Sequence, residues 1–165
     1  MYPLISKEKP IKFTATKYQS AISPSYIFVS DDSDYVVMGH RDTQKIEFTY
    51  NDLKQNTGGT LLEMNLNGQF RAVPVTDGKS IFMALGPTVM VFDMKSGEML
   101  DWVEVNEPSL EGYSGTITRL IIDDGKLIAL VDSKSASIFD LKKFYQSAGQ
   151  RQNPYNSTAK ILFPN

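Results

Sequence analysis

The chain has 165 residues, of which 41% are hydrophobic, as expected for one ordinary globular domain with its own core. Its formal net charge of −2 argues against a nucleic-acid-binding face, which is usually strongly basic. No apolar run approaches the roughly 20 residues of a membrane span, and the first residues lack the apolar core of a signal peptide. The absence of cysteine excludes disulfides, thiol nucleophiles and thiolate metal sites. We therefore expect a cytoplasmic or virion-associated protein, not secreted through a signal peptide, with no nucleic acid or membrane partner.

Residues 1–20 are predicted to form an N-terminal arm or strand, because 11–18 alternates apolar and polar residues. Residues 21–165 are predicted to form a single β domain, since Tyr, Phe, Val, Ile and Thr favour strands. We divide this domain into three repeats, at 21–68, 69–112 and 113–165.

The first repeat predicts strands at 26–29, 35–38, 46–50 and 61–66. A cluster of acids, Asp31, Asp32 and Asp34, marks the turn between the first two strands. Residues 40–45 are interpreted as a loop, and so are residues 56–59, which contain two glycines.

The second repeat predicts strands at 70–75, 81–85, 89–93 and 100–103. Asp77-Gly78-Lys79 predicts a tight turn, because glycine accepts positive φ and aspartate bonds its own backbone. Residues 89–93 are apolar on both faces, which predicts a strand buried on both sides.

The third repeat lies 47 residues further on. Asp77-Gly78-Lys79 recurs as Asp124-Gly125-Lys126, and Phe92-Asp93-Met94-Lys95 recurs as Phe139-Asp140-Leu141-Lys142. Two motifs in the same register indicate a true repeat. We expect strands at 117–122, 128–131 and around 138, a helix at 141–148 and a last strand at 160–163. Phe92 and Phe139 are predicted core residues.

The pattern of Val91-Phe92-Asp93 followed by Ser96-Gly97-Glu98 resembles a blade of a β-propeller of the WD40-like or quinoprotein-like kind. The repeat length also lies in the blade range of roughly 40–50 residues. The resemblance implies an all-β fold of antiparallel four-stranded blades, three in this chain. It implies no site residues, because Gly39-His40 follows a strand, Phe-Asp replaces Trp-Asp, and no quinone-binding signature is present.

Three blades cannot close a ring alone, since propellers typically have 4–8 blades. We expect the ring to be completed from outside the chain, either by a homodimer with six blades or by a larger complex.

Candidate partner-binding residues are Trp102, Tyr145, Arg151 and Tyr155. Tyr, Trp and Arg are favoured at binding hot spots, and the last three residues lie in an irregular insertion before the final strand. A surface loop without a partner is the alternative.

No catalytic set is visible. His40 is the only histidine, its nearest local partner is Asp42, and no nucleophile elbow is present. A zinc site needs three or four ligands, and the acidic turn does not match a calcium loop. We therefore expect no enzyme activity, cofactor or metal.

These observations favour a non-catalytic protein–protein interaction or structural module that acts within a larger assembly. One alternative is a virion (phage) structural or decoration protein. Another is a carbohydrate-binding or glycan-active propeller, with acids such as Asp101, Glu104 and Glu107 lining one mouth.

Overall fold

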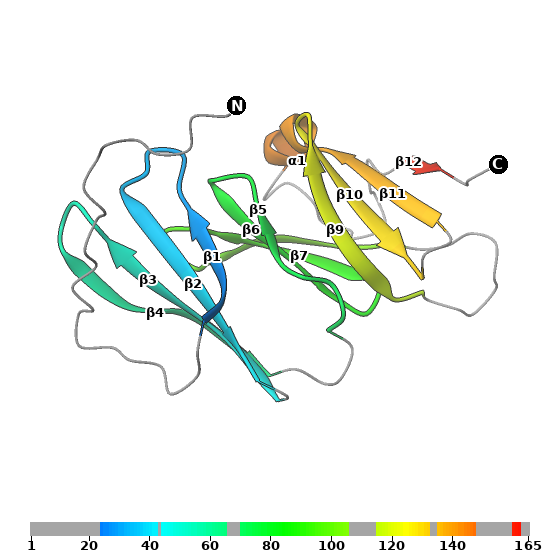
Figure 1. The fold of residues 1–165 in the computed structure, drawn as a ribbon. Coiled ribbons are helices and arrows are strands. Elements are labelled where there is room, and N and C mark those ends of the chain that lie inside the picture. Colours follow the sequence, from blue (N-terminus) through cyan, green and yellow to red (C-terminus); the bar gives the residue numbers. More distant parts are fainter. Residues whose placement is uncertain are drawn as a thin grey trace, which may run out of the picture.

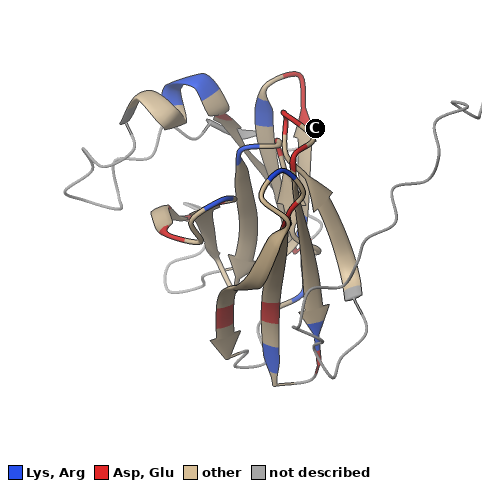
Figure 2. Cartoon of the chain, turned by 90° about the vertical axis from the view of Figure 1, so that its left-hand side faces the viewer, with Lys and Arg blue, Asp and Glu red and all other residues tan. Residues whose placement is uncertain are grey.

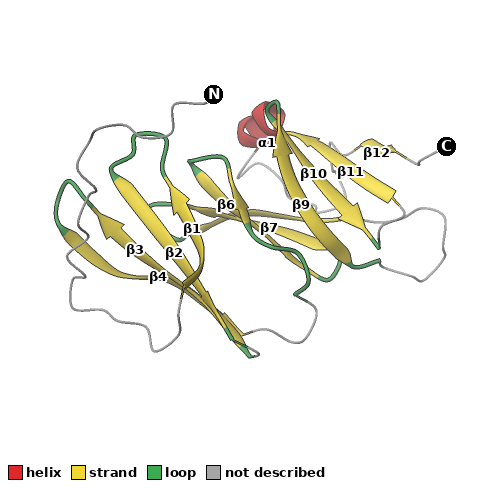
Figure 3. Cartoon of the chain, viewed as in Figure 1, coloured by secondary structure: helices red, strands yellow, loops and turns green. Residues whose placement is uncertain are grey.

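The computed structural model describes residues 24–42, 44–65, 70–105, 115–132, 135–147 and 160–162. These residues form three antiparallel four-stranded sheets and one short helix (Figures 1 and 3). No helix within these ranges has the length and apolarity needed to cross a bilayer. The predicted arm at 1–20 and the repeat boundaries at 68 and 112 lie outside the described residues.

Each sheet is a meander whose hydrogen-bonded neighbours follow chain order. The first sheet consists of β1 (Pro24–Val29), β2 (Tyr35–Arg41), β3 (Lys45–Asp52) and β4 (Thr57–Asn65). The middle sheet consists of β5 (Val75–Thr76), β6 (Ser80–Leu85), β7 (Thr88–Asp93) and β8 (Met99–Glu104). The third sheet consists of β9 (Ile117–Asp123), β10 (Lys126–Val131), β11 (Ser135–Asp140) and β12 (Lys160–Leu162), with α1 (Leu141–Ser147) before β12. The expected all-β, propeller-like fold with three blades is confirmed.

The middle sheet is buried on both faces. Ile81 and Met83 of β6 belong to the core shared with the first sheet. Phe82 and Ala84, which alternate with them, belong to the core shared with the third sheet. Because side chains alternate along a strand, a continuous apolar run can serve two cores at once. The predicted double burial of residues 89–93 is confirmed, since Val91 and Phe92 lie in opposite cores.

In every sheet, the aspartate at the end of the third strand accepts hydrogen bonds from the backbone of the residues that follow it. Asp52 Oδ1 accepts the backbone N–H groups of Lys54 at 3.0 Å and Gln55 at 2.8 Å. Asp93 Oδ1 and Asp140 Oδ1 accept equivalent N–H groups in their own sheets. The residue after each aspartate also donates its N–H to the turn between the first two strands: Leu53 to Asp34 at 2.8 Å, Met94 to Lys79 at 2.9 Å and Leu141 to Gly125 at 3.0 Å.

The strand predicted at 70–75 is wrong over most of its length, because only Val75–Thr76 forms β5. Pro74 has no N–H to donate to a ladder. Phe70 and Ala72 are buried without strand pairing, and the Arg41 guanidinium donates to the Phe70 carbonyl at 3.1 Å. The same guanidinium lies 4.7 Å from the centre of the Phe70 ring.

The predicted loop at 56–59 is also wrong, because β4 begins at Thr57. Asn56 has a φ of 53°, so the turn closes within a few residues and Thr57 pairs with Asp52. Two glycines, Gly58 and Gly59, therefore lie inside a strand.

Gly97 allows the middle sheet to approach the first sheet closely. Its φ is +72°, and a Cβ built on it would overlap the Leu61 carbonyl of β4 and lie 3.1 Å from the carbonyl carbon. Gly125 in the third sheet has nearly the same φ, +69°, but a Cβ there would meet nothing within 4 Å. The two glycines therefore differ in their surroundings and not in backbone conformation.

We expect Gly125→Ala to lower the free energy of unfolding by about 1–2 kcal/mol, the cost of a left-handed alanine. Gly97→Ala adds overpacking against a backbone carbonyl and loses a further ~1–3 kcal/mol. Urea unfolding of the two variants measures the difference. Equal losses would show that the first two sheets do not meet at Gly97.

Candidate functional site

The turn between β1 and β2 joins the first sheet to the middle sheet. The Asp31 N–H donates to the Gly78 carbonyl at 3.1 Å. Lys95 Nζ lies 2.6 Å from Asp32 Oδ2, and Lys79 Nζ lies 3.9 Å from Asp31 Oδ2. Figure 2 shows basic and acidic segments interleaved in these turns, whereas the strands are mainly uncharged. Within the described ranges, no three His, Asp or Glu side chains gather in a group that could hold a metal ion.

Asp32 is the centre of this junction. It accepts hydrogen bonds from the Lys95 ammonium, the Ser30 hydroxyl and the Asp34 N–H. In that order of importance, these donors hold the pKa of Asp32 well below its usual range. The side chain is about half exposed, so solvent and salt weaken the pair with Lys95.

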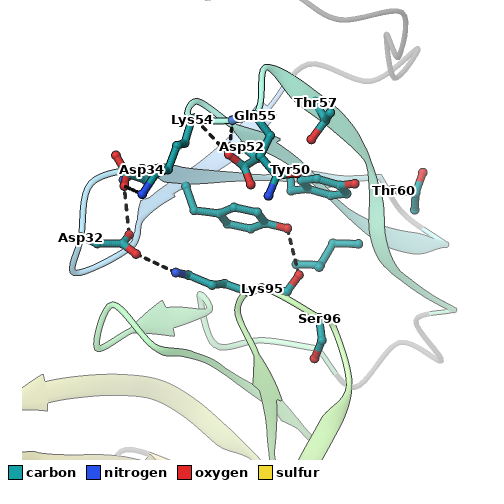
Figure 4. Close-up of a pocket in the computed structure, with 12 residues that line it drawn as sticks. Asp32, Asp34, Tyr50, Asp52, Lys54, Gln55, Thr57, Thr60, Lys95 and Ser96 are labelled. Atoms are coloured by element: carbon teal, nitrogen blue, oxygen red, sulfur yellow. Dashed lines mark hydrogen bonds and ion pairs between the residues drawn. The ribbon is translucent and has the colours of Figure 1, made fainter.

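A cleft of ≈ 630 Å³ opens beside this turn, between the first and middle sheets (Figure 4). Tyr35 lines this cleft and donates its hydroxyl to the Lys95 carbonyl at 2.9 Å. Burial raises the pKa of Tyr35 well above its ordinary value. The ring of Tyr50 stacks on Tyr35 with centroids 5.2 Å apart and planes within 9°. A smaller hollow of ≈ 390 Å³ adjoins the cleft at the Asp32–Lys95 pair.

Tyr145 of α1, a predicted partner-binding residue, makes an internal contact. Its hydroxyl donates to Asp77 Oδ2 at 2.6 Å, and the Ser80 hydroxyl lies 2.9 Å from the same phenol oxygen. Burial, followed by the hydrogen bond to Asp77, raises the pKa of Tyr145 well above its usual range. Tyr145 thus ties the helix to the middle sheet, and its role toward a partner stays a prediction.

Of the other predicted partner-binding residues, only Trp102 lies within the described part of the chain. Trp102 lies on β8 and is 40% exposed, close in the strand to Met99, which is 56% exposed. Arg151 and Tyr155 lie outside the described residues. Their part in binding stays a prediction.

His40 does not lie in a loop, contrary to expectation, because β2 continues through it to Arg41. It is buried, and its Nε2 lies 3.0 Å from the Thr49 hydroxyl on the neighbouring strand. Asp42, its nearest acid in the sequence, accepts the N–H groups of Gln44 and Lys45 and so shapes the β2–β3 turn.

The outward face of the third sheet carries a central row of isoleucines, with charged residues such as Arg119 and Lys126 toward the strand ends. Ile128 at the centre of β10 pairs with Ile121 of β9 and Ile138 of β11, so the three side chains form one row. The residues that alternate with this row, such as Leu127 and Phe139, lie in the core shared with the middle sheet. All three isoleucines are half-buried.

The outward face of the first sheet is apolar along its first two strands. Ile27 and Val29 of β1 are 66% and 48% exposed. They pair with Met38 and Val36 of β2, whereas Phe28 between them points into the core. The same face of the first sheet also carries the buried polar residues His40, Glu47 and Thr49, so its exposed apolar side chains belong to β1.

No protein-family model and no curated protein matches the chain. Among solved structures it is similar to hydrazine synthase from Kuenenia stuttgartiensis, with 14% identity and a TM-score of 0.47 over 79% of this chain and 36% of that one. It is also similar to BamB from Moraxella catarrhalis, with 15% identity and a TM-score of 0.43 over 71% of this chain and 46% of that one. The chain thus spans less than half the length of either structure, and neither likeness carries a conclusion about function.

The Asp32–Lys95 pair makes stability depend on pH. Because the folded-state pKa of Asp32 is lowered, its contribution is present above the unfolded value of about 4 and is lost as the pH falls through the folded value. We expect Asp32→Asn to lower the melting temperature near neutral pH and to differ progressively less from the wild type below pH ~4. Thermal unfolding from neutral to acid pH measures this.

Glu98→Gln, which removes an exposed carboxyl outside the junction, serves as the control. Lys95→Met should reproduce the effect of Asp32→Asn, and the double variant should lose little more than either single one. A gap between Asp32→Asn and the wild type that is constant with pH would contradict the coupling.

Proposed function

We propose that the chain is a non-catalytic protein-interaction module whose two end faces pack against further β-sheets in an assembly. The observation that carries this proposal is the isoleucine row of the third sheet, Ile121, Ile128 and Ile138. In the middle sheet, the apolar residues on both faces of β6 are covered by the neighbouring sheets. An apolar row of this kind on a sheet face is typical of a surface that another protein covers. The finer assignment to a WD40-like or quinoprotein-like family stays a prediction.

A second copy of the chain is the simplest occupant. Each copy offers the outward face of its third sheet to the outward face of its partner's first sheet, with Ile27 and Val29 exposed there. Two such contacts are related by a two-fold axis, the commonest symmetry of oligomers. The pair then contains six sheets, which lies within the usual range of 4–8 blades for a closed propeller.

The proposed absence of catalysis is supported by the surroundings of the polar residues. His40 is buried between strands against Thr49, and Asp42 shapes a turn. The acids of the β1–β2 turn are engaged with lysines of the two sheets. Each of these polar side chains therefore has a structural role in the fold that requires no catalytic activity.

Ile128→Lys tests the end-face contact, because a lysine in the middle of the row opposes burial of this face. At micromolar concentration we expect the wild type to have twice the 18.5-kDa chain mass in light scattering, and the variant to have the mass of one chain. Gln146→Lys adds the same charge on the exposed surface of α1 and should leave the wild-type mass unchanged. Circular dichroism checks that both variants keep their strands.

A wild type with the mass of one chain would remove the second copy as the occupant. A purified complex with another protein that Ile128→Lys dissociates would then keep the interaction role and assign the face to that protein. The proposed function would be contradicted if the wild type is a monomer and Ile128→Lys dissociates no complex with another protein.

A further inference from the structure

The cleft between the first and middle sheets is a separate candidate site. It lies on the inner face of the first sheet, whereas the proposed protein contact uses the outer face. Its volume of ≈ 630 Å³ lies within the range of roughly 300–1,000 Å³ that is typical of small-ligand sites. The assembly proposed above neither needs nor fills this space.

The ring of Tyr50 lines the cleft. Tyr50 of β3 stacks on Tyr35 of β2, and its neighbour on the other side, in β4, is Gly59. A Cβ built on Gly59 would lie 3.4 Å from Cε1 of Tyr50 and 3.8 Å from its hydroxyl. These are ordinary van der Waals distances, so the Tyr50 ring already lies close to the Gly59 backbone, and any side chain at this position would contact the phenol.

The β3–β4 hairpin places hydrogen-bonding groups of both kinds around this ring. Asp52 is oriented by the two N–H groups that its Oδ1 accepts, which leaves Oδ2 as an acceptor. The Gln55 amide and the Thr57 hydroxyl are exposed at the mouth and can each donate or accept. Figure 4 shows Asp52, Gln55 and Thr57 on the same side of the cleft as Tyr50.

The charges of the cleft disfavour an ionic ligand. Two lysines line it, but Lys95 pairs with Asp32 at 2.6 Å and Lys54 lies 3.9 Å from Asp34. Asp52 adds a third carboxylate, so no surplus of positive charge is available for a phosphate. Within the described residues, no group of three or more His, Asp or Glu side chains is arranged to hold a metal ion.

We propose that this cleft binds a neutral saccharide. An aromatic face, a fixed carboxylate and an adjacent amide match the alternating C–H faces and hydroxyl groups of a sugar ring. A sugar ring lies in the cleft that Tyr50 lines. Its hydroxyls donate to Asp52 and exchange hydrogen bonds with Gln55 and Thr57.

The test uses the ¹⁵N-labelled full chain, titrated with a panel of neutral mono- and disaccharides and, separately, with inorganic phosphate and calcium chloride. We expect at least one sugar to shift the amide resonances of residues 50–60, and neither ion to do so. Gln55→Ala should weaken binding by about 2- to 10-fold, the effect of one lost hydrogen bond. Gly59→Thr should weaken binding, because a threonine side chain at this position would contact the Tyr50 ring.

Gln146→Ala, which removes the same amide from exposed α1, should bind as the wild type does. Ile128→Lys should also retain sugar binding, because Ile128 lies outside the cleft. The saccharide proposal and the end-face proposal can therefore be refuted separately. If Gly59→Thr lowers the melting temperature, its loss of binding could come from unfolding. The result for Gln55→Ala, at an exposed position, then decides whether the cleft binds the sugar. The proposal is overturned if no sugar shifts these resonances, if phosphate or calcium shifts them instead, or if Gln55→Ala binds like the wild type.

Discussion

The burial of both faces of the middle sheet is the constraint on which the rest of the structure depends. Successive residues of β6, Ile81 and Phe82, enter opposite cores, so a shift of one residue in strand register would exchange the two sets. The sheet accepts such a shift poorly, because Phe82 and Ala84 differ in volume from Ile81 and Met83. The two outer sheets are positioned by what this strand presents to them.

The polar contacts at the sheet edges set how closely neighbouring sheets approach. Gly97 brings the middle sheet against the β4 backbone, and the Asp32–Lys95 pair joins the turns a short distance away. Between these two contacts the sheets stay apart and leave the cleft that Tyr35 lines. At the junction between the middle and third sheets, the Tyr145 hydroxyl bonds to Asp77 and fixes α1 to the middle sheet. This junction is therefore held by different contacts from the junction between the first and middle sheets. The repeat therefore produces equivalent sheets but unequal junctions.

Much of the fold is predictable from the sequence because the repeat carries its own local chemistry. Asp93 and Asp140 cap equivalent corners, and the apolar run at 89–93 indicates burial on both faces. Local patterns mislead where tertiary contacts decide: Gly58 and Gly59 suggest a loop but lie in β4. The candidate site is harder to predict from the sequence than the fold is. Tyr35 and Tyr50 meet only through the β2–β3 register, and the hydrogen bond from Tyr145 to Asp77 joins residues 68 positions apart in the sequence.

Native-state hydrogen exchange of the full chain measures whether the middle sheet is the most stable part of the fold. If the middle sheet is the core shared by both neighbours, the amides of Ile81 to Ala84 exchange only through global unfolding, while those of the outer strand β1 exchange faster through local opening. We expect the β6 amides to be the most protected of the chain and to respond to denaturant with the full unfolding slope. Protection of β6 no greater than that of β1 would contradict this expectation.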